Sequence, residues 1–227
     1  MTAPDQTIII NGVEFRRHEN GGGLVALTAY AAPTAYVGPG AVVADNARIT
    51  GSARVVDKAV VSGHAWLFGH AKVSGRARVF DKALVSDYAH VSDYAHVYGD
   101  ARISGNARVS RYARVSGHAH AHGNAQTSDH ARVSGNAEVY GDAEVSGNAQ
   151  VHGRANVYGN ARVYGKAQVF DCARVYGDAQ VSDGAHVFEY VHVCGDAWVR
   201  GSTRVYGSIH VDTRHTVFGE SQPYDLG

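Results

Sequence analysis

The six residues Ala161–Lys166, "ARVYGK", are one copy of the unit that decides the fold of this chain. From position 23 to position 220 the sequence divides into 33 consecutive hexads of the pattern Ala-x-Val-x-Gly/Asp-x, with no insertion or deletion. The first position is alanine in 28 hexads, the third is Val, Ile or Leu in 30, and the fifth is Gly or Asp in 27. A period that covers almost nine-tenths of the chain predicts a repeat architecture.

Each hexad contains the signals for one short strand and one corner. The alternation Ala-x-Val-x places alanine and valine on one face of a strand and the two variable residues on the other face. The fifth and sixth positions, such as Gly159-Asn160 or Asp81-Lys82, form a two-residue corner that tolerates unusual backbone angles. Because no signal for a chain reversal interrupts the pattern, the chain should wind in one direction and stack its coils as parallel strands, which is a solenoid.

The repeat also fits a known family signature, an aliphatic residue followed four positions later by a small one, as in Val163…Ala167 and Val139…Ala143. It resembles the hexapeptide-repeat family of left-handed parallel β-helices. The resemblance implies that three hexads form one triangular coil of 18 residues, so that the 33 hexads form about 11 coils. We therefore expect an all-β chain, folded as a left-handed parallel β-helix about 50 Å long if each coil adds about 4.8 Å.

The ends of the chain depart from the hexad and suggest three segments. Residues 1–22 should form an N-terminal cap, in which Thr7–Phe15 reads as a β-hairpin around an Asn11-Gly12 turn. Residues 23–220 form the β-helix and residues 221–227 a C-terminal tail. A cap is expected because an open solenoid exposes the edges of its sheets.

Composition limits the classes of partner and the cellular location. Lys plus Arg and Asp plus Glu are both 21, so the net charge is zero and neither nucleic acid nor a membrane surface is expected as partner. No apolar run has membrane-spanning length, and the N-terminus lacks the form of a signal peptide. The two cysteines do not make a disulfide framework. We expect a cytoplasmic protein, or a virion component if it is a phage structural protein, and no secretion by a signal peptide.

Outward residues that lie 18 positions apart should stack in columns, and two columns are aromatic. One column contains Tyr140, Tyr158 and Tyr176, and another contains Phe170, Phe188 and Tyr206. Such ladders either stabilise the coils by stacking or are buried by a partner. We predict these six residues as the candidate binding surface. The family resemblance implies a homo-oligomer, with a trimer favoured, and a protein partner is a further possibility.

One mixed set of outward residues has the composition of a zinc site. His192 and Cys194 should stack on His210 and Asp212, which places four ligand types that zinc accepts on adjacent strands. The alternative is that these positions are simply polar because they face solvent. We expect no cofactor for this chain, and zinc at these four residues is the alternative.

A second histidine cluster, His118, His120 and His122, lies near the middle of the repeat. His120 and His122 should point outward from one face, about 7 Å apart along the strand, and could hold a transition metal or a phosphate. No carboxylate or cysteine joins the run, although Glu138 should stack above His120. The alternative is again an ordinary solvated face.

The core beneath this histidine cluster should be thin. Ala121 and Thr127 occupy the third hexad position, where nearly every other hexad has an aliphatic residue. Loss of valine bulk there should cost about 1–3 kcal/mol if the cavity stays open.

The sequence favours a non-catalytic function. The leading "NGVEFRR" and the junction "GGGLV" (Gly21–Val25), followed by long GNARV and GDAEV arrays, resemble hexapeptide-repeat proteins of phages and prophages. This resemblance implies a structural or binding rod, either a virion component or a host-factor binder. The alternative is a hexapeptide-repeat enzyme, either a zinc-dependent enzyme like γ-carbonic anhydrase or, less favoured, an acyltransferase. Acyltransferases of the family bind acyl-CoA between subunits with the help of loop excursions or a C-terminal helix, which this sequence lacks, and no residue is singled out as catalytic.

Overall fold

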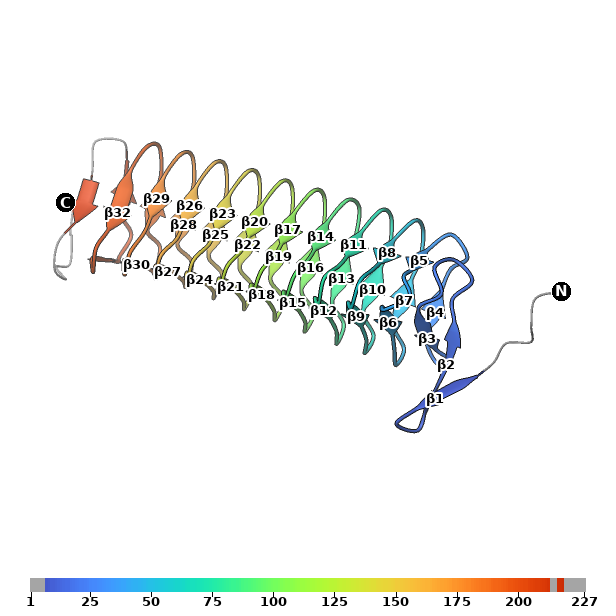
Figure 1. The fold of residues 1–227 in the computed structure, drawn as a ribbon. Helices are drawn as coiled ribbons and strands as arrows, with labels where there is room; N and C mark the ends of the chain where they lie inside the picture. The colour runs from blue at the N-terminus through green and yellow to red at the C-terminus, as the bar shows by residue number, and fades with distance from the viewer. Residues whose placement is uncertain (1–6, 213–215, 219–227) are drawn as a thin grey trace.

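The computed structural model describes residues 7–212 and 216–218, and these form a long rod of stacked coils (Figure 1). The described residues contain strands and turns but no helix, and therefore no helix long and apolar enough to cross a membrane. The three-sided rod has the shape of a left-handed parallel β-helix of about 11 coils, which confirms the predicted fold class.

Three parallel sheets run along the rod, and each hexad contributes one strand to one of them. The parallel part of sheet A consists of β3 (Leu24–Ala26), β6 (Val42–Val43), β9 (Val60–Val61), β12 (Arg78–Val79), β15 (His96–Val97), β18 (Arg114–Val115), β21 (Arg132–Val133), β24 (Gln150–Val151), β27 (Gln168–Val169), β30 (His186–Val187) and β33 (Arg204–Val205). Sheet B consists of β4 (Tyr30–Ala31), β7 (Arg48–Ile49), β10 (Trp66–Leu67), β13 (Leu84–Val85), β16 (Arg102–Ile103), β19 (His120–Ala121), β22 (Glu138–Val139), β25 (Asn156–Val157), β28 (Arg174–Val175), β31 (His192–Val193) and β34 (His210–Val211). Sheet C consists of β5 (Tyr36–Val37), β8 (Arg54–Val55), β11 (Lys72–Val73), β14 (His90–Val91), β17 (Arg108–Val109), β20 (Gln126–Thr127), β23 (Glu144–Val145), β26 (Arg162–Val163), β29 (Gln180–Val181), β32 (Trp198–Arg200) and β35 (Thr216–Phe218).

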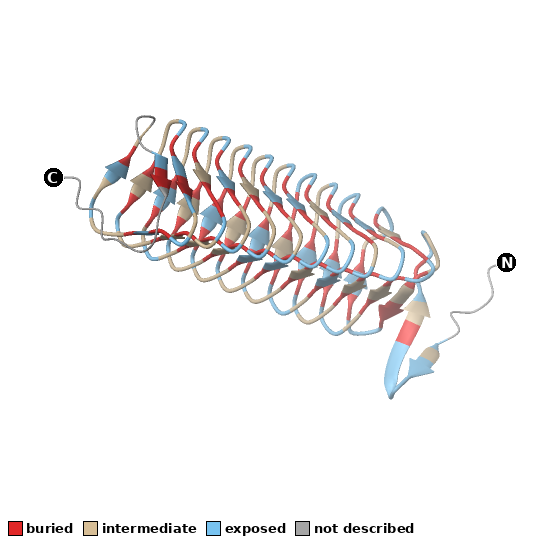
Figure 2. Cartoon of the chain, turned by 60° about the vertical axis from the view of Figure 1, so that its left-hand side comes forward, coloured by how far each residue is buried: buried red, intermediate tan, exposed pale blue. Residues whose placement is uncertain are grey.

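Each coil is held to the next by backbone hydrogen bonds that continue around the corners. In one hexad, the N–H groups of Arg48, Thr50 and Ser52 donate to carbonyls of the next coil at 2.9, 2.8 and 2.8 Å. Most strands are only two residues long, shorter than the predicted four-residue alternation, because the backbone bends into the corner at the fourth hexad position. The predicted alternation of burial is nevertheless present, with alanine and valine inside and the variable residues outside (Figure 2).

The corners depend on one residue in the left-handed backbone region. From Asp45 to Gly201, every fifth-position residue has φ between 55° and 75°. Glycine adopts this conformation without steric cost, and Asp and Asn adopt it more readily than other residues do. Space is also short: a Cβ added to Gly63 would lie 2.7 Å from the Asp81 nitrogen in the next coil. The Gly/Asp preference of the sequence therefore follows from backbone geometry.

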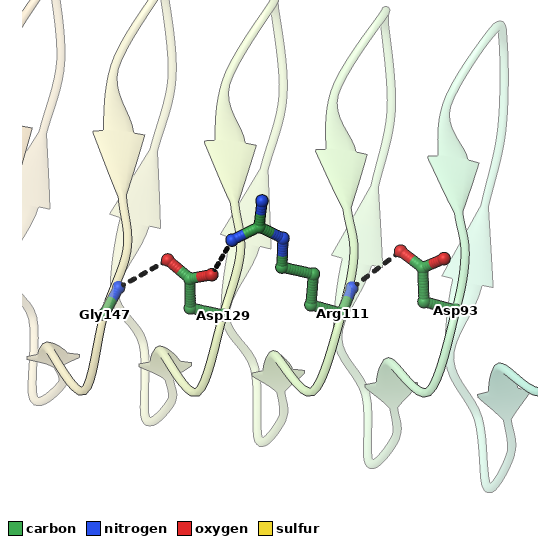
Figure 3. Close-up of polar contacts among 4 residues, drawn as sticks. All are labelled: Asp93, Arg111, Asp129 and Gly147. Atoms are coloured by element: carbon green, nitrogen blue, oxygen red, sulfur yellow. Dashed lines mark hydrogen bonds and ion pairs between the residues drawn. The ribbon is translucent and has the colours of Figure 1, made fainter.

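Aspartate at a corner has a second role, because its carboxylate reaches the N–H group of the corner residue one coil later. Asp93 accepts a hydrogen bond from the Arg111 N–H at 2.9 Å, and Asp129 accepts one from the Gly147 N–H at 3.1 Å (Figure 3). The same contact recurs in the pairs Asp45–Gly63, Asp57–Gly75, Asp81–Gly99, Asp87–Gly105 and Asp183–Gly201, and with glutamate in Glu189–Gly207. The carboxylates thus satisfy donors that would otherwise depend on water.

The N-terminal hairpin is formed as predicted. Strands β1 (Ile8–Ile10) and β2 (Val13–Arg17) pair antiparallel around Asn11 and Gly12, whose φ values are 49° and 79°. Strand β2 then pairs antiparallel with β3, so the hairpin extends sheet A beyond the first coil (Figure 1). The predicted tail, residues 221–227, lies outside the described residues.

The predicted thin point in the core contains an unsatisfied hydroxyl. Ala121 and Thr127 are each only 1% exposed. Within residues 7–212 and 216–218, the Thr127 Oγ1 is the one buried side-chain polar atom without a hydrogen-bond partner. The Thr203 hydroxyl, equally buried, donates to the Arg200 carbonyl at 2.7 Å.

This contrast predicts opposite effects for the same substitution. Thr127→Val keeps the shape of the side chain and removes an unpaired buried hydroxyl, so it should stabilise the protein by about 1 kcal/mol. Thr203→Val removes a hydroxyl that has a hydrogen-bond partner, so it should destabilise by about 1 kcal/mol. Urea unfolding of the two variants measures both effects, and a loss of stability in Thr127→Val would contradict the assignment.

A second prediction concerns Arg111, which occupies a corner at φ 58° without being glycine or aspartate. Arg111→Gly and Arg111→Ala both remove the ion pair with Asp129, but only glycine removes the strain of the left-handed conformation. Arg111→Gly should therefore be more stable than Arg111→Ala by about 1 kcal/mol. Thermal unfolding at one pH tests this order, and equal stabilities would show that the corner imposes no strain here.

Candidate binding surface

The predicted tyrosine column lies on sheet B and is longer than expected. His122, Tyr140, Tyr158 and Tyr176 stack ring on ring, with successive centroids 4.9 Å apart. Burial raises the pKa of Tyr140 above its usual value, and the nearby ionisable groups of Tyr158 and Glu138 raise it further. The ladder holds adjacent coils in register because each ring packs on the ring of the next coil.

The second predicted column lies on sheet A. Phe170 and Phe188 have ring centroids 4.8 Å apart, and Phe188 and Tyr206 5.3 Å apart. His152 extends this stack at the other end, 5.0 Å from Phe170. The six predicted binding residues therefore form two ladders on two different sheets rather than one patch. Since the ring faces contact each other, a partner would meet mainly ring edges; partner binding itself stays a prediction.

The four predicted zinc ligands lie near one end of sheet B. His192 and His210 are in register, with ring centroids 4.6 Å apart. Cys194 is engaged with the tyrosine ladder, since a hydrogen bond between the Cys194 thiol and Tyr176, together with burial, raises the pKa of that tyrosine to about 12. In the described ranges, no group of three or more His, Cys, Asp or Glu residues is placed to hold a metal ion. Zinc binding at these four residues stays a prediction for metal analysis.

The histidine run is more closely gathered than its spacing predicts. The ring centroids of His120 and His122 are 4.4 Å apart rather than about 7 Å, because the chain bends into a corner at His122 and the two rings lean together. His120 Nε2 lies 3.1 Å from the Ser104 Oγ, and Glu138 stacks beside His120 as predicted. A carboxylate does join the run, contrary to expectation: Asp100 Oδ2 lies 3.8 Å from His118 Nδ1.

A third surface feature was missed in the sequence, a hollow of about 500 Å³ on sheet A that we call the sheet A hollow. One side of it is formed by Arg114 and Arg132, which are register partners on β18 and β21. Both side chains are exposed, and neither forms an ion pair within the described part of the chain. His96 precedes them in the same column, and burial and the charges of Arg114 and Arg78 lower the pKa of His96.

The opposite side of the sheet A hollow is a stack of aromatic rings at the corner between sheets C and A. Tyr94 and Tyr112 have centroids 5.1 Å apart, and Tyr112 and His130 5.0 Å apart. Asn148 and Gln150 complete the lining with two amide groups. The stack is exposed, with Tyr112 at 52%, so its edges and hydroxyl groups are accessible.

Two carboxylates, those of Asp93 and Asp129, immediately precede Tyr94 and His130 of this wall in the chain. Asp93 accepts from the Arg111 N–H, while Asp129 accepts from the Gly147 N–H and the Arg111 guanidinium (Figure 3). These contacts with Gly147 and Arg111 lower the pKa of Asp129. No carboxylate lines the hollow itself, so the positive charge of Arg114 and Arg132 is not neutralised there.

The sequence contains a signal for this hollow. Tyr94, Tyr112 and His130 are 18 residues apart, but they occupy the sixth hexad position. The predicted columns consist of second and fourth hexad positions, which face outward from the strands. The sixth position lies at the corner and projects beside the next sheet, so its contact with the arginine column depends on the folded shape of the coil.

These features define the class of protein: a left-handed parallel β-helix whose outer columns carry its polar and aromatic chemistry. A repeat-family profile described as the YdcK beta solenoid repeat matches residues 95–110, 101–117 and 155–171. A solved structure with the same architecture is the Arabidopsis UDP-N-acetylglucosamine acyltransferase, at TM-score 0.66 and 14% sequence identity, covering 80% of this chain and 70% of that one. At this identity the likeness concerns the fold alone. A search of curated proteins found no match.

The histidine run predicts a pH dependence of stability. Burial and the nearby His122 lower the pKa of His120 below its ordinary value of 6.5. The unfolded chain therefore binds this proton more readily, so stability is lost as the pH falls through the unfolded value. Between about pH 7.5 and 5.5 the urea midpoint should fall, and it should fall less in His120→Asn. Asparagine occupies the same column at Asn156, so the variant should fold; identical pH slopes would contradict the assignment.

Proposed function

We propose that this protein is a non-catalytic binding rod that assembles with copies of itself and presents its outer columns to a partner. One observation carries the proposal: the coils follow one another without a loop excursion from β3 to β34. Every outward side chain is thereby fixed in a column with a repeat of one coil. Such a surface suits recognition of an extended partner through repeated contacts.

The uninterrupted coils also count against the acyltransferase alternative. The resembled acyltransferases use loop excursions or a C-terminal helix to build the wall of an acyl-CoA cleft, and residues 24–212 contain neither. The Arabidopsis acyltransferase is a structural neighbour at 14% identity, which supports a common fold and gives no residue of a shared active site. Neither this neighbour nor the repeat family is described as a phage protein, so the virion role is not part of the proposal.

For the assembly we favour the phenylalanine ladder of sheet A over the tyrosine ladder of sheet B. Phe170 and Phe188 have no polar group to satisfy, whereas the tyrosines carry hydroxyls, one of which bonds the Cys194 thiol. Aromatic residues are enriched in the buried parts of protein interfaces, and phenylalanine can be buried there without a hydroxyl that needs a hydrogen-bond partner. A trimer agrees with the resembled family, in which clefts and interfaces lie between three rods.

Assembly predicts a difference between two matched substitutions. Light scattering after size-exclusion chromatography should give three times the 24.1 kDa mass of one chain. Phe188→Ser should lower this mass, while Tyr158→Ser should leave it unchanged, although each removes a central ring and about 1 kcal/mol of stacking. Serine occurs naturally in the sheet A column at Ser116 and Ser134, so folding should be preserved. A parent protein that is monomeric, or a mass unaffected by Phe188→Ser, would refute the proposed interface.

The enzyme alternative is tested on the same samples. Acyl transfer from acyl-CoA to UDP-N-acetylglucosamine should not exceed the rate without protein. Turnover that co-purifies with the chain and is abolished by a single histidine substitution would replace the rod proposal by an acyltransferase. Stoichiometric zinc that is lost in a His192→Ala, Cys194→Ser double variant would instead favour the zinc-enzyme alternative.

A further inference from the structure

The sheet A hollow joins unneutralised positive charge to neutral hydrogen-bonding groups. Arg114 and Arg132 lie side by side on adjacent parallel strands, about 4.8 Å apart along the rod. Like charges in directly paired positions destabilise a sheet. Two planar guanidiniums at this separation can together bind one anionic group through charge-assisted hydrogen bonds, which would offset that repulsion.

The remainder of the lining suits a ligand rich in hydroxyl groups. Hydrogen-bond donors and acceptors are offered by the phenol groups of Tyr94 and Tyr112, the His130 ring and the Asn148 and Gln150 amides. The three rings are held by stacking on one another, and Arg76 lies over the outer Tyr94 ring at 5.7 Å. A volume of about 500 Å³ is within the range of sites for small ligands.

The spacing and charge of the residues that line the hollow match an extended sugar chain better than a nucleic acid. One coil advances about 4.8 Å, close to the length of one pyranose unit in an extended chain. The lining contains only two unpaired guanidiniums on a chain of zero net charge, far fewer cations than a phosphate backbone requires. A second hollow of about 220 Å³ beside Ser116 and Ser134, across the same two arginines, widens the accessible surface for such a chain.

We propose that the sheet A hollow binds an acidic oligosaccharide, with Arg114 and Arg132 on its carboxylate or phosphate group and the aromatic corner and amides on its hydroxyl groups. This inference rests on the proposed binding role and names its ligand class. A uronic acid and a sugar phosphate share the required chemistry, an anionic group attached to a polyhydroxylated ring. A neutral sugar lacks the anionic group, and a free anion lacks the polyhydroxylated ring.

Isothermal titration calorimetry on the full chain tests the proposal with trigalacturonic acid, glucose 1-phosphate, cellotriose and inorganic phosphate. Trigalacturonic acid or glucose 1-phosphate should bind saturably, and comparison of the two identifies the preferred anionic group. Cellotriose and inorganic phosphate should each bind at least about tenfold more weakly than the better acidic sugar. Absence of saturable binding by both acidic sugars would overturn the proposal, as would tighter binding of a single-stranded oligonucleotide.

Variants locate the site. Arg114→Gln and Arg132→Gln should each weaken binding of the acidic sugar by about tenfold or more, and Gln150 and Gln168 show that the column accepts glutamine. Arg108→Gln, in sheet C and outside the lining of the hollow, is the matched control and should change affinity by less than about twofold. Tyr112→Phe preserves the ring stack and should weaken the acidic sugar but not inorganic phosphate.

The outcomes separate this inference from the proposed function. Equal losses in Arg114→Gln and Arg108→Gln would indicate non-specific charge attraction and refute the site. Binding of inorganic phosphate as tight as that of the sugars, unaffected by Tyr112→Phe, would refute sugar recognition. The oligomeric mass of the same samples reports on the rod assembly independently, so a failed titration with an intact trimer rejects only the ligand.

Discussion

The left-handed backbone conformation at the fifth position of each hexad, from Asp45 to Gly201, is the constraint on which the remainder of the structure depends. A residue with φ near 60–70° turns the chain through each corner in the same sense, as at Gly117 and Asp129. Each strand therefore lies in register beside the strand that follows one coil later, and the two form backbone hydrogen bonds without any insertion. Valine and alanine then fill an interior of constant cross-section. Core, sheets and rod shape all follow from this one torsion.

A second consequence is that chemistry on this molecule is organised in columns. Side chains that cooperate come from residues 18 apart, as in the Tyr140–Tyr158–Tyr176 ladder or the Arg114–Arg132 pair. The rigid spacing favours stacking, which explains why the aromatic ladders are half-buried by their own neighbours. It also works against any centre that needs several side chains to converge on one point, such as a tetrahedral metal site. Extended partners that repeat at the same interval are favoured over compact ones.

The sequence predicted what depends on the backbone and missed what depends on side-chain direction. The hexad gave strands, corners, core residues and columns, and Asn11-Gly12 gave the hairpin, because each of these has a local conformational cause. The lean of His122 toward His120 could not be read from spacing along a strand. The sheet A hollow also escaped, because Tyr112 at a corner and Arg114 on the adjoining strand become the sides of one depression only when the angle of the coil is known. The carboxylate contacts of Asp93 and Asp129 likewise join residues of different coils, although their spacing of 18 residues was available.

Three local costs lie in the middle coils of the rod. Arg111 holds a left-handed conformation, Thr127 buries an unpaired hydroxyl, and Arg114 faces Arg132 without a counter-ion in the described structure. The remaining repeats show that glycine, valine and neutral residues fit these positions, so the fold does not demand the exceptions. Residues that do not suit their local conformation or surroundings tend to occur at functional sites, where another interaction compensates for their cost. The Arg111–Asp129 pair offers such a compensation at the corner itself. The Asp129 carboxylate accepts from the Arg111 guanidinium and the Gly147 N–H and does not line the hollow, so the charge of Arg114 and Arg132 is available to an anion.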